Sequence, residues 1–353
     1  MAPIPPPNDQ IASAIDKHHA SKADYPRPHL GASMLGHHCD RWIWLNFRWA
    51  VKESFPGRIK RLFRRGHSEE AVMVADLKAI GVNLTKTEYD QTRIAFGTHI
   101  GGSVDGIIEG GVPGAEEVRH IAEFKTHNKR SFDDLIKKGV HESKPIHWGQ
   151  VQLYMHGTNI ERALYVAVCK DDDRLYSERI KYDKGAAEKL LDRGRRIALA
   201  ERMPEPISAD PSWYQCKMCS AKSFCHSSKL TQEVNCRTCA HSTPTSDGKW
   251  SCARWDADHV EVEHQVTGCH AHVLHPDLVP WDRRASSDPN EAVYVIEGQE
   301  VRNGEGDAFT FSSRELIEGR DACVNHLVRE AKKIFPDAKM EVKYAPPVST
   351  ESD

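Results

Sequence analysis

Three short segments decide the fold that this sequence predicts: Gly101-Gly-Ser-Val-Asp105, Ile121-Ala-Glu123-Phe-Lys125 and Gln150-Val-Gln-Leu-Tyr154. The first segment ends in an aspartate, and the second carries a glutamate and a lysine two positions apart. Residues i and i+2 of a strand project from the same face, so we expect these two side chains to lie together. Two carboxylates and an ammonium group are costly to assemble unless a divalent cation neutralises them. The alternative is a solvated strand face, because Glu-x-Lys also occurs by chance.

These residue types suit metal-dependent hydrolysis of a phosphodiester. A Mg²⁺ or Mn²⁺ ion polarises the phosphoryl oxygen and lowers the pKa of the attacking water. Carboxylate oxygens are the ligands that such hard ions prefer. Lys125 would orient or deprotonate the water, or stabilise the developing negative charge. His67 can add an imidazole ligand, although a histidine on a helix is more often an ordinary surface or core residue.

The composition is that of an ordinary soluble protein of about two domains. The chain has 353 residues, of which 39% are hydrophobic and 28% are charged. It contains no run of 18 apolar residues, so the sequence predicts no transmembrane helix and no membrane partner. The N-terminus lacks the features of a signal peptide. We therefore expect a cytoplasmic protein whose cysteines are metal ligands rather than disulfides.

The net charge of −3 argues against binding nucleic acid through overall charge. A local basic groove can still hold a phosphate backbone. The strongest local concentration is the segment 58–65, with five cations in eight residues. A solvated helix face explains that segment equally well.

Apolar periodicity predicts an α/β core over residues 30–205. Three or four antiparallel strands are expected between 82 and 125, after a long helix that ends near Gly81. The remaining expected elements are helices over 10–20, 131–138, 144–157 and 184–202, strands over 163–169 and 175–182, and a tail with strands over 292–301 and 308–311 and a helix over 314–335.

The order of these features resembles the RecB-like branch of the PD-(D/E)XK nuclease superfamily. The matching pieces are Gly66-His67 on a helix, Gly-x-x-Asp at 102–105, Glu-x-Lys at 123–125 and Gln-x-x-x-Tyr at 150–154. The resemblance covers residues 33–230 and implies a restriction-endonuclease-like core, a mixed central sheet flanked by helices. It assigns no secure role to Glu70. By the same resemblance His67, Asp105 and Glu123 bind Mg²⁺ or Mn²⁺, Lys125 is the catalytic lysine, and Gln150 and Tyr154 position the lysine or the DNA.

A first cysteine motif follows the core, Cys216-x₂-Cys219-x₅-Cys225. Its three thiolates can reach one centre, which needs a fourth ligand. RecB-like nucleases with an iron–sulfur cluster, of the AddB type and the CRISPR-associated exonuclease type, combine such a motif with one upstream cysteine. The resemblance thus implies a [4Fe–4S] cluster on Cys39, Cys216, Cys219 and Cys225. A zinc ion in the same cage and unpaired thiols are the alternatives.

A second motif, Cys236-x₂-Cys239-x₁₂-Cys252-x₁₆-Cys269, suits a tetrahedral structural zinc ion. Nearby histidines leave the fourth ligand open, and the cationic and aromatic residues between the thiols either stack on single-stranded nucleic acid or form the core of this region. Cys169 and Cys323 are expected to be buried thiols. The histidines are His241, His259, His264, His270 and His272, and the residues between the thiols include Lys249, Trp250, Arg254 and Trp255.

The sequence therefore predicts a metal-dependent DNA exonuclease that acts on single-stranded or duplex ends in recombination, repair or phage DNA metabolism, with a recombination or replication protein as a further partner. Arg64, Arg65, Lys129 and Arg130 would grip flanking phosphates. The rivals are a structure- or nick-specific endonuclease, a non-catalytic DNA-binding or assembly factor, and a redox-sensing iron–sulfur protein. The expected domains are a flexible arm (1–29), the nuclease domain (30–230), a zinc-binding module (231–280) and an α+β tail (281–353).

Overall fold

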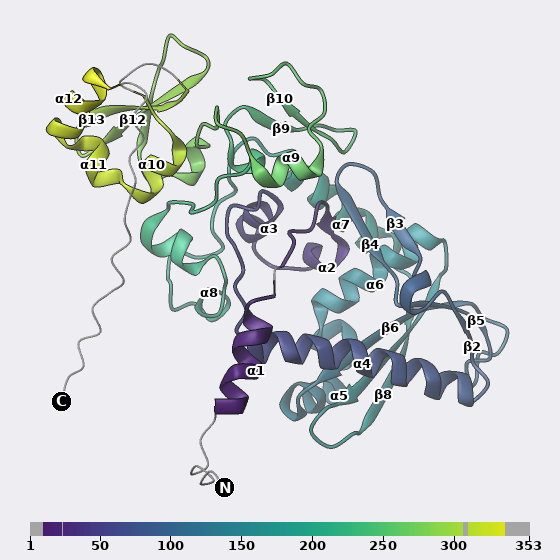
Figure 1. Ribbon diagram of the computed structural model, residues 1–353. Helices are drawn as coiled ribbons and strands as arrows, with labels where there is room; N and C mark the ends of the chain where they lie inside the picture. Colours follow the sequence, from purple (N-terminus) through teal and green to yellow (C-terminus); the bar gives the residue numbers. More distant parts are fainter. Residues whose placement is uncertain (1–9, 23, 306–309, 336–353) are drawn as a thin grey trace, which may run out of the picture. The chain divides into compact units, whose positions relative to one another are not determined.

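The computed structural model describes residues 10–22, 24–305 and 310–335 (Figure 1). The chain forms two compact units. The first comprises Met1–Phe47, Glu53–Ala200 and Ser246–Gly248, and the second comprises Arg48–Lys52, Glu201–Thr245 and Lys249–Asp353. The first unit thus extends to residue 200, and the motif Cys216–Cys225 belongs to the second unit.

A five-stranded sheet forms the centre of the first unit, in the order β2-β5-β6-β7-β8. Strands β6 and β7 pair in parallel, and every other pairing in this sheet is antiparallel. The expected mixed central sheet is thus confirmed. The strands expected between 82 and 125 were predicted to be antiparallel, but β6, the last of them, also pairs in parallel with β7. The strands are β2 (Asn83–Thr85), β5 (Gly106–Gly110), β6 (His120–His127), β7 (Arg162–Cys169) and β8 (Leu175–Lys181).

Helices cover both faces of this sheet, which is what a parallel strand pair requires. On one face α4 (Gly57–Ala79) lies across the sheet (Figure 1). It contributes Met73 and Val74 to a core with Ala122 and Phe124 of β6. The crossover from β6 to β7 consists of two further helices that contact both strands. Since side chains alternate along a strand, Glu123 and Lys125 project from the face opposite Phe124. The crossover helices are α5 (Lys129–Ser143) and α6 (Pro145–Thr158), and α7 (Lys184–Ala198) packs against α6.

Helix α5 is interrupted near its C-terminal end. Gly139 adopts φ +74°, a left-handed conformation that favours glycine, and this break follows directly after residue 138, where the predicted helix ends. The amide of Val140 then donates to Glu178 Oε2 of β8 at 2.8 Å. The break therefore ties the crossover to the edge strand of the sheet.

The rest of the described first unit consists of the helices α1, α2 and α3, a 3₁₀ turn and a small sheet. Gly57 allows α1 to cross α4 closely, because a Cβ atom there would lie 1.9 Å from the carbonyl oxygen of Asp16. Residues 1–9 of the expected N-terminal arm lie outside the described residues. These elements are α1 (Gln10–Ala20), α2 (Ala32–Leu35), α3 (Asp40–Phe47), the 3₁₀ turn Glu88–Asp90, and a three-stranded sheet of β1 (Leu30–Gly31), β4 (Ile100–Ser103) and β3 (Arg93–Ala95).

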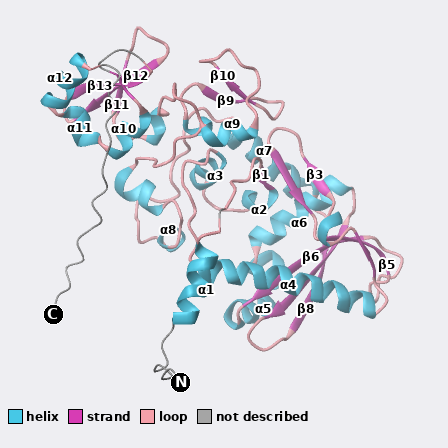
Figure 2. Cartoon of the chain, viewed as in Figure 1, coloured by secondary structure: helices cyan, strands magenta, loops and turns pink. Residues whose placement is uncertain are grey.

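The second unit has few regular elements before residue 281 (Figure 2). They are α8 (Tyr214–Lys217), the π turn Phe224–Ser228, the 3₁₀ turns Cys236–Thr238 and Pro276–Leu278, a hairpin of β9 (Ser242–Pro244) and β10 (Trp250–Cys252), and α9 (Val262–Thr267). Two buried guanidinium groups stack on tryptophans in this part: Arg237 Cζ lies 3.7 Å from the ring centroid of Trp49, and Arg48 Cζ lies 5.4 Å from that of Trp250. Trp250 is therefore a core residue.

The tail of the second unit is an α+β arrangement, as expected. The single helix predicted over 314–335 is divided in three, because Gly319 ends the first part and the Asn325 side chain caps the third by accepting from the amide of Leu327. Within the described ranges, no helix is long and apolar enough to cross a membrane. The elements are β11 (Asp282–Arg284), β12 (Glu291–Ile296), β13 (Gln299–Gly304), β14 (Thr310–Phe311), α10 (Ser313–Glu318), α11 (Arg320–Val324) and α12 (His326–Ile334).

Candidate active site

Asp105 lies at the bend between β4 and β5, where part of β6 has no strand neighbour on its β5 side. Strand β5 pairs with β6 only through Gly106–Ile108, opposite His120–Ala122. Beyond that point Asp105 Oδ2 accepts a hydrogen bond from the amide of Phe124 at 2.9 Å. The side chain thus replaces the missing strand partner, and this bond holds the carboxylate beside the next residues of β6.

Glu123 is fully buried, with 0% of its surface exposed. One oxygen, Oε1, forms an ion pair with Lys125 Nζ. The other, Oε2, has no hydrogen-bond partner among the residues that the structure describes. Burial raises the pKa of Glu123 to about 8; the Lys125 charge opposes this rise and the neighbouring Asp105 carboxylate adds to it. A buried carboxylate oxygen is thereby available for a cation.

Lys125 keeps its proton in this setting. Burial lowers the pKa of the amine, but the charges of Glu123 and Asp105 more than offset that effect and leave the pKa above its ordinary value. The ammonium group also donates to the carbonyl oxygen of Phe124 at 3.2 Å. The site therefore holds a fixed positive charge next to two carboxylates.

Helix α6 supplies the polar side chains that face this group. Gln150 Nε2 donates to Tyr154 Oη at 3.2 Å. Burial, together with the charge of Glu123, raises the pKa of Tyr154 to about 12, so the phenol stays protonated. The approach depends on Gly102, because a Cβ atom there would lie 2.7 Å from Tyr154 Cε1. The structure thus brings together Asp105, Glu123, Lys125, Gln150 and Tyr154, five of the residues predicted for the site.

Glu70 of α4 also belongs to this electrostatic environment, although the sequence assigned it no role. Its carboxylate contributes to the raised pKa of Glu123, and its Oε1 accepts a hydrogen bond from Gln91 Nε2 at 3.0 Å. His67, the predicted metal ligand, lies exposed one turn earlier on α4. Among the described residues, no hydrogen bond or ion pair joins His67 to either carboxylate of the site. The i, i+3 spacing of His67 and Glu70 on α4 is a signal from which the sequence analysis could have identified Glu70.

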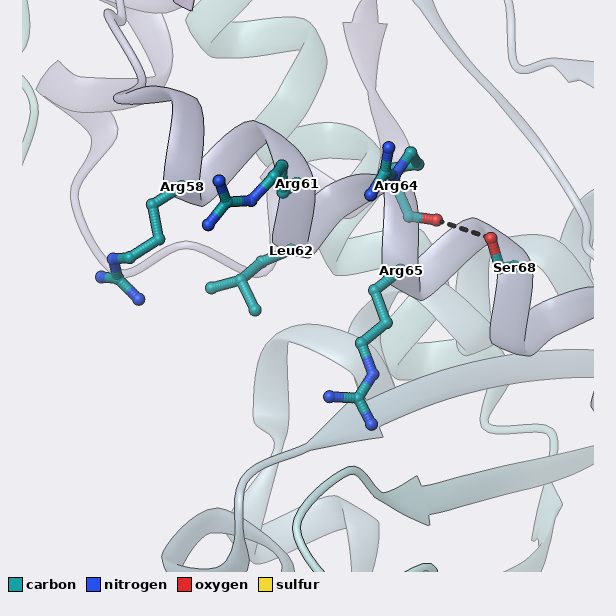
Figure 3. Close-up of a pocket in the computed structure, with 6 residues that line it drawn as sticks. All are labelled: Arg58, Arg61, Leu62, Arg64, Arg65 and Ser68. Atoms are coloured by element: carbon teal, nitrogen blue, oxygen red, sulfur yellow. Dashed lines mark hydrogen bonds between the residues drawn. The ribbon is translucent and has the colours of Figure 1, made fainter. Parts of the chain in front are cut away.

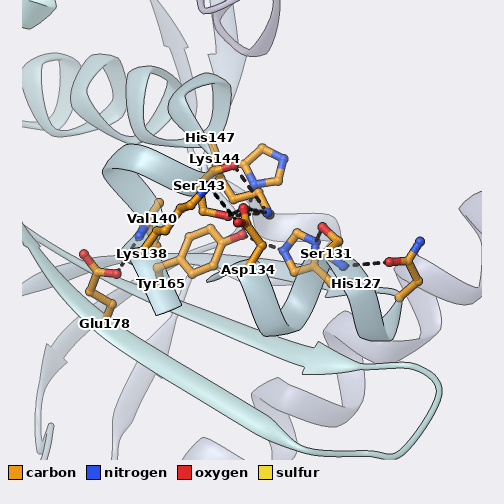
Figure 4. Close-up of polar contacts among 11 residues, drawn as sticks. His127, Ser131, Asp134, Lys138, Val140, Ser143, Lys144, His147, Tyr165 and Glu178 are labelled. Carbon is orange, nitrogen blue, oxygen red and sulfur yellow. Dashed lines mark hydrogen bonds and ion pairs between the residues drawn. The ribbon is translucent and has the colours of Figure 1, made fainter. Parts of the chain in front are cut away.

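A buried polar cluster beside Lys125 was not predicted at all (Figure 4). The phenol of Tyr165, which pairs with Glu123 across β6 and β7, lies between two imidazoles. Its oxygen is 3.0 Å from His127 Nε2 and 2.9 Å from His147 Nδ1, and His127 Nδ1 is 3.2 Å from Ser131 Oγ. A phenol carries one proton, so it donates to one ring and accepts from the other. We call these four residues the His–Tyr–His cluster.

The two histidines of the His–Tyr–His cluster are neutral at neutral pH. Burial, together with the charges of Lys144 and Lys125, lowers the pKa of His127 to about 4. Burial lowers the pKa of His147 to about 3, with Lys125 as the next cause. The cluster therefore fills the space beside Lys125 with neutral dipoles that add no positive charge.

Six residues of α4 line a hollow of about 380 Å³ on the surface of the first unit (Figure 3). Arg61 pairs with Asp16 of α1, and Arg65 donates to the carbonyl oxygen of Lys170 at 3.0 Å. We call this feature the arginine groove. Lys129 and Arg130, the other predicted phosphate contacts, are exposed at the start of α5. The arginine groove consists of Arg58, Arg61, Leu62, Arg64, Arg65 and Ser68.

The four cysteines of the expected iron–sulfur cluster are divided between the two units. Cys216, Cys219 and Cys225 occupy one short stretch of the second unit, in which the amide of Cys219 donates to the carbonyl oxygen of Cys216 at 3.1 Å. Cys39 precedes α3 in the first unit, and its sulfur accepts from the amide of Trp42 at 3.4 Å. In the part of the chain that the structure describes, no three His, Cys, Asp or Glu side chains form a ready metal cage. The cysteine–metal assignments stay predictions.

Comparison with family models and with curated proteins gives no match for this chain. Among solved structures, the chain is similar to LHK-Exo, an alkaline exonuclease from Laribacter hongkongensis, in complex with dAMP: 17% identity, TM-score 0.36, over 52% of this chain and 90% of that one. Another structure of LHK-Exo is 18% identical, with a TM-score of 0.35, over 52% of this chain and 90% of that one. The structure of SSO0001 is 18% identical, with a TM-score of 0.37, over 61% of this chain and 96% of that one. These identities and TM-scores are too low to carry an argument.

The pKa values of the His–Tyr–His cluster predict a loss of stability in acid. A histidine whose pKa is lowered on folding takes up its proton first in the unfolded state, so stability falls as the pH drops below 6.5 towards about 4. At about pH 5, His127 would contribute a loss of about 2 kcal/mol.

The measurement is chemical unfolding of wild type and His127→Asn at about pH 7.5 and about pH 5. We expect the variant to lose less free energy of unfolding between the two pH values, because asparagine does not titrate. His141→Asn, on the exposed face of α5, is the control and should behave like wild type. Equal acid sensitivity of wild type and His127→Asn would contradict the neutral assignment.

Proposed function

We propose that the first unit hydrolyses phosphodiester bonds of DNA with the help of Mg²⁺ or Mn²⁺. The observation that carries this proposal is the buried Glu123 Oε2, which lacks a hydrogen-bond partner among the described residues while Asp105 is held beside it. An unsatisfied buried polar atom costs about 1–3 kcal/mol, and more when it is charged. A hard divalent cation satisfies carboxylate oxygens of this kind. The donor set therefore fits the ion.

Asp105 and Glu123 would hold the metal, and Glu70 or His67 would complete the protein ligands. When bound, the ion would polarise the phosphoryl oxygen and acidify a water molecule. The carboxylate of Glu123 must lose its proton to become a ligand, which the rise of its pKa to about 8 opposes and a divalent charge favours. This competition predicts stronger metal binding as the pH rises towards about 8.

The other side chains of the site act on the substrate and on Lys125. The ammonium group of Lys125 is protonated, so it stabilises negative charge on the phosphate rather than accepting a proton. Tyr154 and Gln150 are hydrogen-bonded to each other and supply neutral donors towards the same place. A restriction-endonuclease-like core of the RecB-like kind is the fold that best accounts for this order of residues on β6 and α6.

Exonuclease action on DNA ends is the specific activity that we propose, and it rests on the sequence resemblance. A structure- or nick-specific endonuclease would use the same chemistry. A non-catalytic binding factor would not need a buried glutamate such as Glu123, whose negative charge requires a cation beside it. The substrate form therefore separates the two catalytic alternatives, and a variant of Glu123 separates both from the binding factor.

Replacing Glu123 with glutamine should lower the rate of DNA cleavage about a thousandfold or more, because it removes the buried negative charge and keeps the shape. The assay compares degradation of end-labelled linear DNA and covalently closed circular DNA with added Mg²⁺ or Mn²⁺. Glu109→Gln, an exposed residue of β5 paired with Arg119, is the matched control and should keep wild-type activity.

Cleavage of the linear DNA alone supports the exonuclease, whereas cleavage of closed circles supports the endonuclease. The catalytic proposal is wrong if wild type leaves both substrates intact, or if Glu123→Gln cleaves as fast as wild type.

The arginine groove is our proposal for the surface that grips the DNA backbone. Arg58 and Arg64 are exposed on its rim, and the groove extends along α4 to Ser68, two residues before Glu70. Guanidinium groups bind phosphate oxygens through paired N–H donors. Such contacts release counterions, so binding weakens as salt is added.

Replacing both Arg58 and Arg64 with alanine should weaken DNA binding equally for all sequences and reduce the slope of log affinity against log salt by about 2. Fluorescence anisotropy with catalytically inactive Glu123→Gln protein measures this without degradation. Lys78→Ala, at the exposed C-terminal turn of the same helix, is the control. An unchanged slope would show that the DNA lies elsewhere.

The first cysteine motif is our proposal for an iron–sulfur cluster, with ligands Cys39, Cys216, Cys219 and Cys225. Its support is the resemblance together with three thiols on one short segment of the second unit, a soft donor set that accepts iron or zinc. When bound, such a cluster would link residues far apart in the chain and restrict the unfolded state.

Protein purified without oxygen should show a broad visible absorbance and contain about four iron atoms per chain. Cys219→Ser should lose both, because it removes one ligand, whereas Cys169→Ser, at a buried thiol of β7, should keep both. Wild-type protein that contains zinc and no iron would overturn this assignment in favour of a zinc site.

A further inference from the structure

A tight turn in the second unit presents two thiols at its ends. Asn235 caps the 3₁₀ turn Cys236–Thr238 by accepting from the amide of Arg237 at 2.9 Å, and the amide of Cys239 donates to the carbonyl oxygen of Cys236 at 3.1 Å. The amide of Val273 points at Cys239 Sγ at 3.5 Å. Amide donors to sulfur stabilise a thiolate rather than a thiol. The turn therefore places two thiols at the Cys-x₂-Cys spacing, at which both sulfur atoms can bind one metal ion.

Two remote segments bring further thiols to this turn. Cys252 ends β10, where its amide and carbonyl exchange hydrogen bonds with Ala257 at 2.8 and 3.0 Å, and it pairs with Ser242 of β9. Cys269 follows Gly268, which has φ +66° and packs so closely that a Cβ atom would lie 3.3 Å from Asn235 Cα. The segment before Cys269 thus lies against the residue before Cys236.

The backbone places the four segments next to one another. Ser242, which pairs with Cys252 across the β9–β10 hairpin, donates its amide to the carbonyl oxygen of Cys239 at 3.3 Å, and Gly268 packs on Asn235. In the described residues the thiols do not form a closed cage, so an ion would have to draw the four sulfur atoms together.

Most of the neighbouring histidines are engaged elsewhere. Both ring nitrogens of His272 have partners, with Nδ1 2.8 Å from Ser313 Oγ and Nε2 3.1 Å from Thr238 Oγ1. His259 pairs with Glu261 and His270 pairs with Glu305. His241 is the competitor for the fourth position, because its Nε2 is buried without a hydrogen-bond partner among the described residues.

We propose that Cys236, Cys239, Cys252 and Cys269 bind one structural Zn²⁺ ion that ties the 3₁₀ turn to the end of β10 and to the segment after α9. Four thiolates fill a tetrahedral site and leave no open position, so the ion stabilises the fold and takes no part in catalysis. The region between 201 and 281 has few regular elements, and a metal supplies the stability that such a region lacks. The proposal is independent of the nuclease activity.

The proposed zinc site also complements the charge of the buried arginine next to it. Trp250 of β10 is buried against Arg237, which follows Cys236 directly. The guanidinium of Arg237 also donates to Gln265 Oε1 of α9 at 2.9 Å. A site of four thiolates and one Zn²⁺ carries a net negative charge, which complements these buried cations.

The test is the zinc content of the full-length protein, measured by mass spectrometry in wild type and in Cys252→Ser, Cys269→Ser, His241→Gln and Cys169→Ser. We expect each of the first two variants to contain one zinc equivalent less than wild type. His241→Gln and the buried-thiol control Cys169→Ser should retain the wild-type content. A second readout, which does not depend on stability, is the thiolate-to-metal absorption of Co²⁺-substituted wild-type protein, which should correspond to four sulfur ligands.

An unchanged zinc content in Cys252→Ser and Cys269→Ser overturns the proposal. Loss of zinc in His241→Gln with retention in Cys269→Ser overturns the four-thiol ligand set in favour of three thiols and a histidine. Cleavage of DNA by these variants separates the two proposals, because a zinc-free variant that still cuts DNA leaves the nuclease assignment intact.

Discussion

The hydrogen bond from the amide of Phe124 to Asp105 is the contact on which the candidate site depends. It forms where β5 ends and β6 continues, so a side chain takes the place of a strand. An unpaired amide in that position would be costly, because it is shielded from water. The hydrogen bond that the Phe124 amide requires therefore also holds in place the Asp105 carboxylate, which a catalytic cation would need as a ligand.

The burial of Glu123 follows from the same arrangement. The parallel pairing of β6 and β7 needs helices on both faces, and the crossover helices close over the face from which Glu123 and Lys125 project. A lone carboxylate there would take up a proton, and Lys125 compensates only one of its two oxygens. The fold thus creates an electrostatic demand that the protein's own described side chains leave unmet.

The two parts of the second unit are stabilised by different interactions. Its tail has an ordinary apolar core around Tyr294 and Phe311, whereas the preceding region relies on guanidinium–tryptophan stacking and on short turns. Burial lowers the pKa of Arg237 to about 9, which reflects the cost of holding its charge in that core. Thiols gathered on a fixed backbone are the feature of this region that a bound ion would convert into stability.

The sequence by itself determined the α/β class and, through strand and helix periodicity, the shared face of Glu123 and Lys125 and that of Gln150 and Tyr154. The family resemblance in the order of these motifs predicted that they form one group with Asp105. Only the tertiary structure decided that β6 pairs in parallel with β7, that Glu70 faces the carboxylates, and that His127, Tyr165 and His147 fill the space beside Lys125. It also divided the chain at residue 200 and broke the last predicted helix at Gly319 and Asn325. Pairing partners and burial depend on residues distant in the chain, whereas periodicity reports only on neighbours, which is the physical reason for the difference.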